Sequence, residues 1–437
     1  MGQHIDILSS GNYRDTYYTR SSQPALDCPS LNGHVEAEVC VIGGGIAGVS
    51  IAYELQESGK SVVLLESDRI AWGGSGRNGG LVLPGYAADT ASIEKRLDLK
   101  RSKELFDMSV EGMEIFRTYT KELDLPDVDI QNGCIRVARY RNSKAMQDAA
   151  KHKSEAYGYP QEYLSSEELR KQVRSERYFD GVYDPTAFHA HSLNYCLGLS
   201  RAFLRRGGKI FENTRAVSMK RHKTEHVVST TGGSVKCKTV VMCQGGLVDG
   251  FDKKMQRNLL PVGTFVTVTE PLGARAQEAL NTTAAIVDTR MSCDYFRITT
   301  DNRLLWGSGM SGFAREPSNL EQKLKEGFVS VFPQLADVRT EIAWGGLTGY
   351  TRHRMPYLRE LNAGVWAATG LGGHGLNVGP LFGRLLAEAL VENGRRHQSF
   401  DPFGLTWNGS VFGPMAADVV YFWEAIKENS NERRYAK

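Results

Sequence analysis

The chain has 437 residues, and its 53 lysines and arginines against 50 aspartates and glutamates give a net charge of +3 at pH 7. Because the basic residues are scattered, this balance gives no reason to expect a nucleic-acid partner. The 41% hydrophobic content is ample for a sizeable core, and no apolar run approaches the length that a bilayer span needs. Seven cysteines without a C-x-x-C pair favour reduced thiols. With no secretory pattern visible at the start, we expect a cytoplasmic protein.

A glycine turn between two short apolar strands is the strongest signal in the N-terminal part. The run 39–42 leads into Gly43, Gly45 and Gly48 in a G-x-G-x-x-G pattern, a helical pattern follows, and the strand 61–65 delivers Glu66. Such a unit binds dinucleotides, because the glycines permit a tight turn, a close pyrophosphate and close helix packing. The helix N-terminus attracts phosphates, and the acid accepts ribose hydroxyls. The predicted contacts here are Gly43, Gly45, Ile46, Ala47, Gly48, Glu66 and Ser67.

A second glycine-rich segment, 73–80, follows the ribose acid within a few residues. Its backbone can lie flat against an extended ligand, Ser75 and Arg77 can reach phosphates, and Asn78 can reach a ring edge. This segment favours FAD over NAD. The alternative is a surface loop rich in turn residues. The predicted contacts here are Gly74, Ser75, Arg77, Asn78, Gly79, Gly80 and Leu81.

The rest of the chain alternates between two kinds of segment. Helical periodicity over 91–123 and a strand at 131–138 begin a substrate domain, and a strand-rich stretch from 261 to 344 continues it. Between them, a strand over 209–217 and an apolar strand ending at Gly245 return to the nucleotide. We therefore expect an N-terminal extension (1–34), a discontinuous FAD-binding domain (35–95, 188–255 and 356–400), a substrate domain (96–187 and 256–355) and a C-terminal segment (401–437).

A third glycine turn follows the apolar strand 365–369. Gly370, Gly372 and Gly375 spell a second G-x-G-x-x-G, which would indicate a second nucleotide and an NAD(P)H-dependent reductase. The helix after this turn leads to Gly394 without a second strand or a ribose acid. We therefore reject a second dinucleotide site.

The first two glycine segments resemble the D-amino-acid-oxidase superfamily of FAD-dependent oxidoreductases. The third resembles the G-x-x-G-H-G flavin motif of the amine oxidase family. Within the superfamily the chain is most similar to the γ-glutamylputrescine oxidase group and is related to monomeric sarcosine oxidase and glycine oxidase. The matching stretches are 75–80, 295–297, 303–307, 332–335, 344–346 and 351–356.

This resemblance implies an α/β (α+β) fold, with a Rossmann-like FAD-binding domain intertwined with a substrate domain on a mostly antiparallel sheet. It also implies that Val217 contacts adenine through its backbone and that Gly245 passes close to the ligand. The third turn and the helix after it would approach the N1–C2=O edge of the flavin, where a helix dipole or a cation stabilises the reduced form. The residues that this motif contributes are Gly372, Gly373, His374, Gly375 and Leu376.

Departures from the relatives refine the expectation. Thr348 stands where sarcosine oxidases tether flavin through a cysteine, and Asn78 lies near the tethering histidine of dimethylglycine dehydrogenases, so we expect noncovalent FAD. Asn377 replaces a lysine that binds a substrate carboxylate, which disfavours a small α-amino acid. Leu305 is the best match to a lysine that activates O2. Oxidase and dehydrogenase therefore both stay open.

The predicted reaction is hydride transfer to flavin N5 from the carbon next to an amine nitrogen, after which the imine hydrolyses to an aldehyde and an amine or ammonia. The expected partners are a secondary or γ-glutamylated amine and O2 or another acceptor, with no metal, in amine or polyamine catabolism. Tyr295 and Arg297 share a strand face, and we expect them to line the substrate side with His374 and Tyr350, Arg297 binding a distal carboxylate. The alternatives are a D-amino-acid or glycine-type oxidase or dehydrogenase, and an electron-transfer flavoprotein without its own substrate.

Overall fold

The six-stranded sheet carries the first glycine turn. The structure is a computed structural model that describes residues 11–246 and 251–435. The sheet has the order β18-β19-β12-β2-β3-β8, and all its pairs are parallel except β18–β19. Its strands are β2 (Val39–Ile42), β3 (Val62–Leu65), β8 (Lys209–Phe211), β12 (Thr239–Met242), β18 (Tyr357–Asn362) and β19 (Val365–Thr369).

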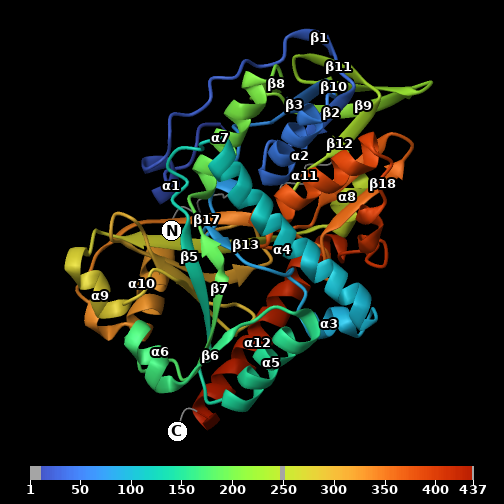
Figure 1. Cartoon of the computed structure of the whole chain (residues 1–437). Helices are drawn as coiled ribbons and strands as arrows, with labels where there is room; N and C mark the ends of the chain where they lie inside the picture. Colours follow the sequence, from blue (N-terminus) through green and yellow to red (C-terminus); the bar gives the residue numbers. More distant parts are fainter. Residues whose placement is uncertain (1–10, 247–250, 436–437) are drawn as a thin grey trace.

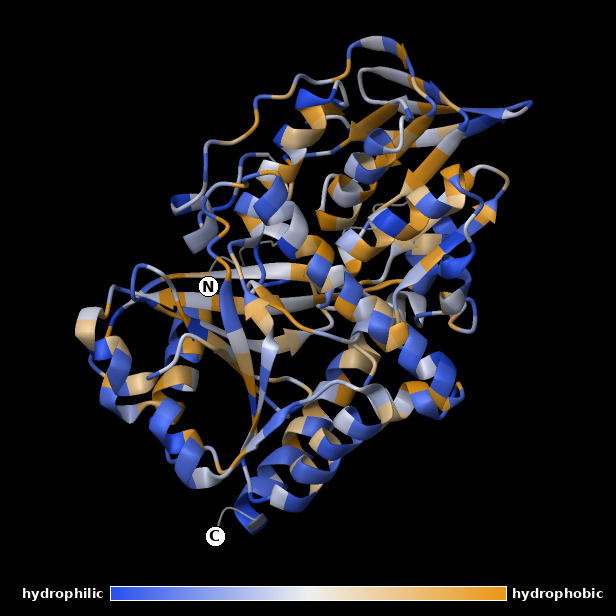
Figure 2. Cartoon of the chain, viewed as in Figure 1, coloured by the Kyte–Doolittle hydropathy of each residue, from blue (hydrophilic) through white to orange (hydrophobic). Residues whose placement is uncertain are grey.

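Strands buried on both faces read as continuous apolar runs, and β2, β3 and β19 are buried at every position. These strands are hydrophobic along their length in Figure 2. Helices α2, α7 and α11 lie beside this sheet in Figure 1. Because Ile42 pairs with both Leu65 and Met242, the parallel strands end together. The three segments that follow them therefore meet at one sheet edge, where open α/β sheets bind ligands.

The helices are α1 (Tyr17–Arg20), α2 (Ile46–Glu57), α3 (Thr90–Glu94), α4 (Leu99–Glu122), α5 (Ser143–Tyr157), α6 (Ser166–Gln172), α7 (Ser192–Arg205), α8 (Lys253–Asn258), α9 (Ala276–Ala279), α10 (Leu320–Val331), α11 (Gly375–Val391) and α12 (Gly413–Tyr435). The helical periodicity over 91–123 thus corresponds to two helices, α3 and α4. None of the helices in the described ranges is long and apolar enough to cross a bilayer.

The nine-stranded sheet has the order β17-β13-β16-β15-β14-β5-β7-β4, with β6 paired to β7. Among the described residues its ladders are antiparallel except β5–β14. Its strands are β4 (Leu81–Val82), β5 (Gln131–Val137), β6 (Glu162–Leu164), β7 (Gly181–His189), β13 (Leu260–Thr269), β14 (Ala285–Asp288), β15 (Tyr295–Ile298), β16 (Leu304–Ser311) and β17 (Thr340–Tyr350).

The predicted strand over 209–217 is two strands in different sheets. β8 belongs to the six-stranded sheet, and β9 (Ala216–His222) belongs to a four-stranded sheet with β1 (Gly33–Glu36), β10 (Glu225–Thr230) and β11 (Gly233–Cys237). Asn213 separates the two at φ 49°, in the left-handed region that asparagine tolerates. β4 lies inside the predicted nucleotide segment 35–95 yet pairs with β7 in the nine-stranded sheet. The proposed domain boundaries stay a prediction.

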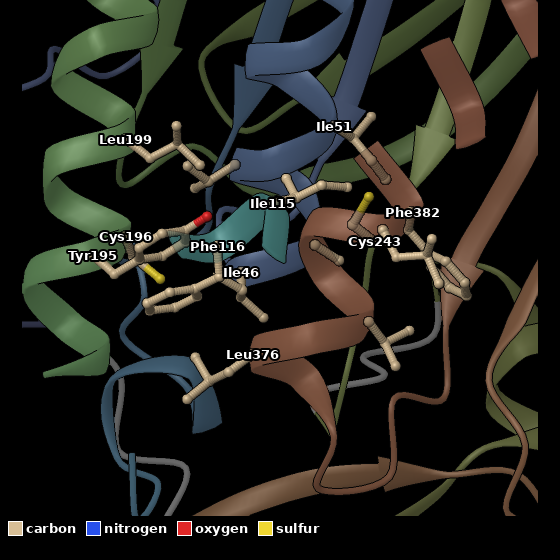
Figure 3. Close-up of a cluster of buried hydrophobic side chains, with 14 of the residues drawn as sticks. Ile46, Ile51, Ile115, Phe116, Tyr195, Cys196, Leu199, Cys243, Leu376 and Phe382 are labelled. Carbon is tan, nitrogen blue, oxygen red and sulfur yellow. The ribbon is translucent and has the colours of Figure 1, made fainter. Parts of the chain in front are cut away.

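The largest core cluster joins α2, α4, α7 and α11. Figure 3 shows Ile46, Phe116, Tyr195 and Leu376 within it, and the rings of Phe116 and Tyr195 stack with centroids 3.7 Å apart. Helix α4 approaches α11 at Gly112, where a Cβ would lie 2.1 Å from the carbonyl oxygen of Asn377. This packing fixes the start of α11, and with it the third glycine turn.

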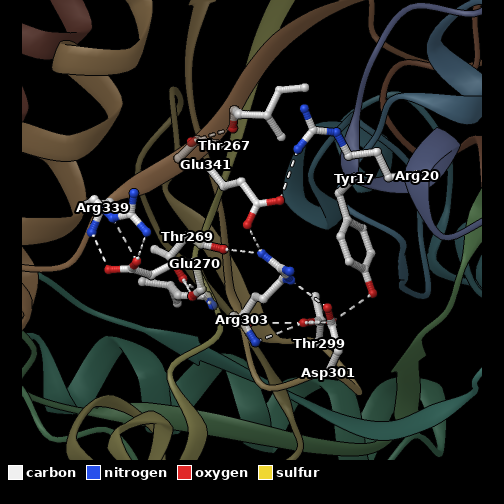
Figure 4. A network of polar contacts seen from close by, with 12 residues as sticks. Tyr17, Arg20, Thr267, Thr269, Glu270, Thr299, Asp301, Arg303, Arg339 and Glu341 are labelled. Atoms are coloured by element: carbon white, nitrogen blue, oxygen red, sulfur yellow. Dashed lines mark hydrogen bonds and ion pairs between the residues drawn. The ribbon is translucent and has the colours of Figure 1, made fainter.

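Ion pairs attach the first described residues to the nine-stranded sheet, as Figure 4 shows. The guanidinium of Arg20 lies 2.9 Å from a carboxylate oxygen of Glu341, and Tyr17 donates a hydrogen bond to Asp301. Arg303 binds both of these acids. The segment that carries α1 is therefore held against the large sheet.

Candidate active site

A cavity of about 980 Å³ extends from the edge of the six-stranded sheet across the nine-stranded sheet. The three glycine segments, the turn after β12 and the helices α3, α4 and α5 contribute to its lining. A volume at the upper end of the range for ligand pockets accommodates a large cofactor together with a substrate.

Glu66 lies at the nucleotide end of this cavity, beside residues 214–216. Its carboxylate accepts hydrogen bonds from the backbone N–H groups of Gly44 (2.6 Å) and Asp68 (2.9 Å) and from the Ser67 hydroxyl (3.1 Å). Burial raises the pKa of Glu66, although the two N–H donors act in the opposite direction. The acid is thus fixed in orientation at the position that a ribose would occupy.

The N-terminus of α2 opens into the next part of the cavity. Gly45 caps this helix without a side-chain acceptor of its own, and the Ser75 hydroxyl accepts the Ile46 N–H at 2.9 Å. The 12-residue helix α2 therefore directs the positive end of its dipole and its free backbone N–H groups at this turn. Both features favour the binding of phosphate. Arg77 stacks 4.1 Å from the ring centroid of Trp72, and burial lowers its pKa to about 10, so it keeps its charge at neutral pH.

Asn78 lines the cavity, but its amide group binds the loop around it. The amide nitrogen donates to the carbonyl oxygens of Gly74 (3.1 Å) and Ser75 (2.9 Å), and the amide oxygen accepts the Gly80 N–H at 2.7 Å. The residue that we expected to reach a ring edge thus shapes the second glycine segment.

The third glycine turn and β17 form the wall at the far side of the cofactor region. At Gly372, which has φ +56°, a Cβ would lie 3.2 Å from the Tyr350 ring. His374 is the N-cap residue of α11 and lines the cavity. Burial lowers its pKa to about 4, and the charge of Arg136 adds to this effect. His374 is therefore a neutral imidazole above that pH, and a cationic role at the flavin edge is disfavoured.

The floor of the cavity is a row of side chains across the nine-stranded sheet. Tyr295 pairs with Val287, Val287 pairs with Arg136, and Arg136 pairs with Val182. All four line the cavity. The Tyr295 ring lies over Gly307, where a Cβ would meet it at 2.0 Å, so a glycine on the neighbouring strand provides its space.

Most of the predicted contacts come together around this cavity. Those that line it are Gly43, Gly45, Ile46, Ala47, Glu66, Ser67, Gly74, Ser75, Arg77, Asn78, Gly79, Leu81, Gly245, Tyr295, Tyr350, Gly372, Gly373, His374, Gly375 and Leu376. Gly48, Gly80, Val217 and Arg297 are not among the lining residues. Gly48 packs against Gly43 in the turn after β2. The Val217 side chain is 50% exposed on β9, while Ala216 takes the cavity position.

Arg297 does not lie on the substrate side of the cavity, where we expected it. Its guanidinium is buried behind the second glycine segment, where it donates to the carbonyl oxygen of Gly79 (3.1 Å) and to the Tyr18 hydroxyl (3.3 Å). A Cβ on Gly80 would lie 3.2 Å from it. The position of Arg297 therefore supports a structural role and does not support the binding of a substrate carboxylate.

The sequence patterns did not identify five lysines and arginines that line the cavity: Arg136, Lys153, Arg215, Arg290 and Arg354. Arg136 alternates with the buried residues Ile135 and Val137 on β5. The sequence feature that could have identified Arg136 is a charged residue between two apolar residues of a strand. Lys153 has no such feature, because α5 carries charged residues along much of its length.

The comparisons with known proteins agree with this geometry. Residues 38–389 match the family described as FAD dependent oxidoreductase. The chain is 34% identical over 391 residues to gamma-glutamylputrescine oxidoreductase of Escherichia coli strain K12, across 89% of this chain and 91% of that protein. It is 24% identical to a glycine oxidase of Geobacillus kaustophilus, across 84% and 96%.

Among solved structures, glycine oxidase from Bacillus cereus superposes with a TM-score of 0.70 at 22% identity, covering 84% of this chain and 98% of that one. The predicted fold, a Rossmann-like FAD-binding part intertwined with a mostly antiparallel sheet, is confirmed by this similarity.

Proposed function

Since the chain belongs to the FAD dependent oxidoreductase family, we propose that it oxidises an amine at the carbon next to the nitrogen. The observation that carries the proposal is the continuity of the cavity. It runs from the Gly43 turn past the His374 turn and then continues over Tyr295 and Val287 toward α5. The residues that we propose for cofactor binding and the space that we propose for the substrate therefore belong to one cavity.

The residues present fit FAD. The N-cap residue of α2 is Gly45, which has no side chain to cap the helix. Gly245 lines the cavity, and a Cβ on it would have no protein atom within 4 Å. Glu66 would hold the ribose, Ser75 and α2 would hold the pyrophosphate, and the third glycine turn with Tyr350 would contact the isoalloxazine. When bound, FAD supplies a hydride acceptor.

The protein's own groups would orient the amine, exclude water and leave the nitrogen unprotonated. Burial raises the pKa values of Tyr295 and Tyr350 and lowers that of His374. None of these three side chains is charged near neutral pH. Uncharged side chains around the reacting nitrogen favour the free amine, whose lone pair must stabilise the carbon from which the hydride leaves.

The substrate that we propose is a secondary or γ-glutamylated amine, supported by the similarity to the Escherichia coli protein. Asn377 disfavours a glycine-type substrate, because it is buried and its amide donates to the Gly85 carbonyl at 3.1 Å. We further propose O2 or another acceptor as the oxidant and a cytoplasmic location, which the seven free cysteines support.

The test is an anaerobic titration of the yellow protein with a panel of amines, followed by admission of air. We expect γ-glutamylated or secondary amines to bleach the flavin absorbance, and the rate of reoxidation in air then distinguishes an oxidase from a dehydrogenase. If D-amino acids or glycine bleach the flavin and amines do not, the substrate class is wrong. If no compound bleaches it, the electron-transfer alternative is favoured.

We predict that acid precipitation releases the yellow colour into the supernatant. Thr348 lines the cavity where a tethering cysteine would stand, and the two cysteines that do line it are Cys243 and Cys293. Burial raises the pKa of the Cys293 thiol to about 12 and raises that of Cys243 further, and a thiol in that state is a poor nucleophile. Absorbance retained in the pellet after washing would contradict noncovalent binding.

A further inference from the structure

We propose that Arg136 and Lys153 form a carboxylate-binding pair in the part of the cavity that extends past Tyr295 toward α5. The pair would select amines that carry a carboxylate about eight or nine bonds from the oxidised carbon. This inference rests on the proposed function and names the chemistry of the substrate's second end.

The two cations lie on different elements and line the same cavity. Arg136 projects from β5, and Lys153 lies on α5 together with the lining residues Met146 and Ala149. The Lys153 ammonium lies 3.8 Å from the ring centroid of Phe106 and 4.2 Å from that of Tyr157. These two rings fix the position of the ammonium without neutralising its charge.

Neither cation is neutralised by an acid. Within the described ranges, Arg136 and Lys153 form no ion pair and no side-chain hydrogen bond. The acids whose charges act on Lys153, Glu94 and Asp184, already accept hydrogen bonds from other groups. Burial and the charge of Arg136 lower the pKa of Lys153 to about 8, as expected for two adjacent like charges.

Two other cations, which follow strands of the nine-stranded sheet, are neutralised. Arg290 lies 2.6 Å from Asp288, and Arg139 lies 2.8 Å from Asp294. An arginine next to a lysine in one cavity therefore departs from the local pattern. A ligand carboxylate would relieve the repulsion and accept charge-assisted hydrogen bonds from both groups.

The sheet register gives the spacing between the backbones of Tyr295 and Arg136, from which we infer the scale of the ligand. Arg136 and Tyr295 both pair with Val287, so they lie two strand spacings apart, about 9–10 Å at their backbones. An extended chain advances about 1.2 Å per bond, so this separation corresponds to about eight bonds. A diamine acylated by a dicarboxylic acid has this length when its free amine end is oxidised.

The experiment compares two substrates of equal length, N-glutarylputrescine with a terminal carboxylate and N-valerylputrescine with a terminal methyl. We expect Arg136→Gln and Lys153→Met each to raise KM for the glutaryl compound tenfold to a hundredfold, the typical range for a lost charge-assisted hydrogen bond. The value of kcat should stay within about twofold, and KM for the valeryl compound should not change. Lys151→Met is the matched control, because Lys151 lies on the same helix outside the cavity lining and pairs with Glu155.

A binding measurement separates the pair from the proposed reaction. N-butylglutaramate carries the carboxylate without the oxidisable amine, and its dissociation constant follows from the perturbation of the flavin absorbance. We expect both variants to weaken its binding tenfold or more. If both substrates suffer equally, or if the variants bind N-butylglutaramate as the parent does, the pair is structural and the inference fails. If no amine is oxidised but the variants still lose N-butylglutaramate binding, the carboxylate site stands and the proposed function fails.

Discussion

Replacing Gly48 with alanine is expected to abolish the soluble yellow protein. A Cβ at this position would lie 1.8 Å from the carbonyl oxygen of Gly43 and 3.4 Å from the Cys243 side chain. The first clash is with backbone, and the Gly43 N–H is itself fixed by a 2.8 Å hydrogen bond to the Leu65 carbonyl. Relief would require α2 to move away from β2. We expect a cost of about 3 kcal/mol or more, measured as lost soluble yield, lost absorbance at 450 nm and a lower Tm.

Two further glycine variants make this result interpretable. Gly404→Ala is the control for folding, because its Cβ would meet no atom within 4 Å and its φ is not positive. Gly45→Ala separates folding from cofactor binding, since its Cβ would lie 3.0 Å from the Ser75 hydroxyl oxygen, which can rotate. We expect Gly45→Ala to fold and to bind FAD weakly, because the added carbon occupies the approach to the pyrophosphate. A Gly48→Ala protein with the parent's colour and Tm would contradict the packing argument.

The cofactor end of the cavity could be predicted because its geometry is local. Gly48 meets Gly43 within a single turn, and Glu66 binds the N–H of Gly44 through one strand pairing. A strand, a glycine turn, a helix and a second strand therefore restrict the positions of these residues before any distant segment is placed. The third glycine turn has no second strand, and it was recognised by its resemblance to the G-x-x-G-H-G flavin motif.

The substrate end depends on contacts between distant segments, which period-two alternation does not reveal. Alternation correctly placed Tyr295 and Arg297 on one strand face, but it does not say what covers each position. Tyr295 opens to the cavity, whereas Gly79 and Tyr18 cover Arg297. Arg136 reaches the cavity through the parallel pairing of β5 with β14, a register that no local pattern specifies.

The rate of flavin reduction by a saturating amine is expected to fall about tenfold per pH unit below the pKa of the bound amine. Only the unprotonated nitrogen can stabilise the carbon that loses the hydride, and an alkylamine in water has a pKa of about 10. The cavity groups near the flavin turn do not titrate in this window. Burial lowers the pKa of His374 to about 4 and raises those of Tyr295 and Tyr350. Stopped-flow reduction between pH 6 and 10 measures the profile.

Three controls assign this ionisation to the substrate. His374→Gln should change the limiting rate and leave the midpoint of the profile in place, because the imidazole is already neutral throughout the range. Lys153 is protonated below a pKa of about 8, so its loss of charge above that pH should weaken the binding of carboxylate-bearing amines. The Lys153→Met variant should not show this pH dependence of binding. An amine whose own pKa is about two units lower should shift the midpoint of the limiting rate by a similar amount. A midpoint that stays fixed across amines of different pKa would instead assign the ionisation to a group of the protein. A rate that does not change with pH would exclude hydride transfer from the neutral amine.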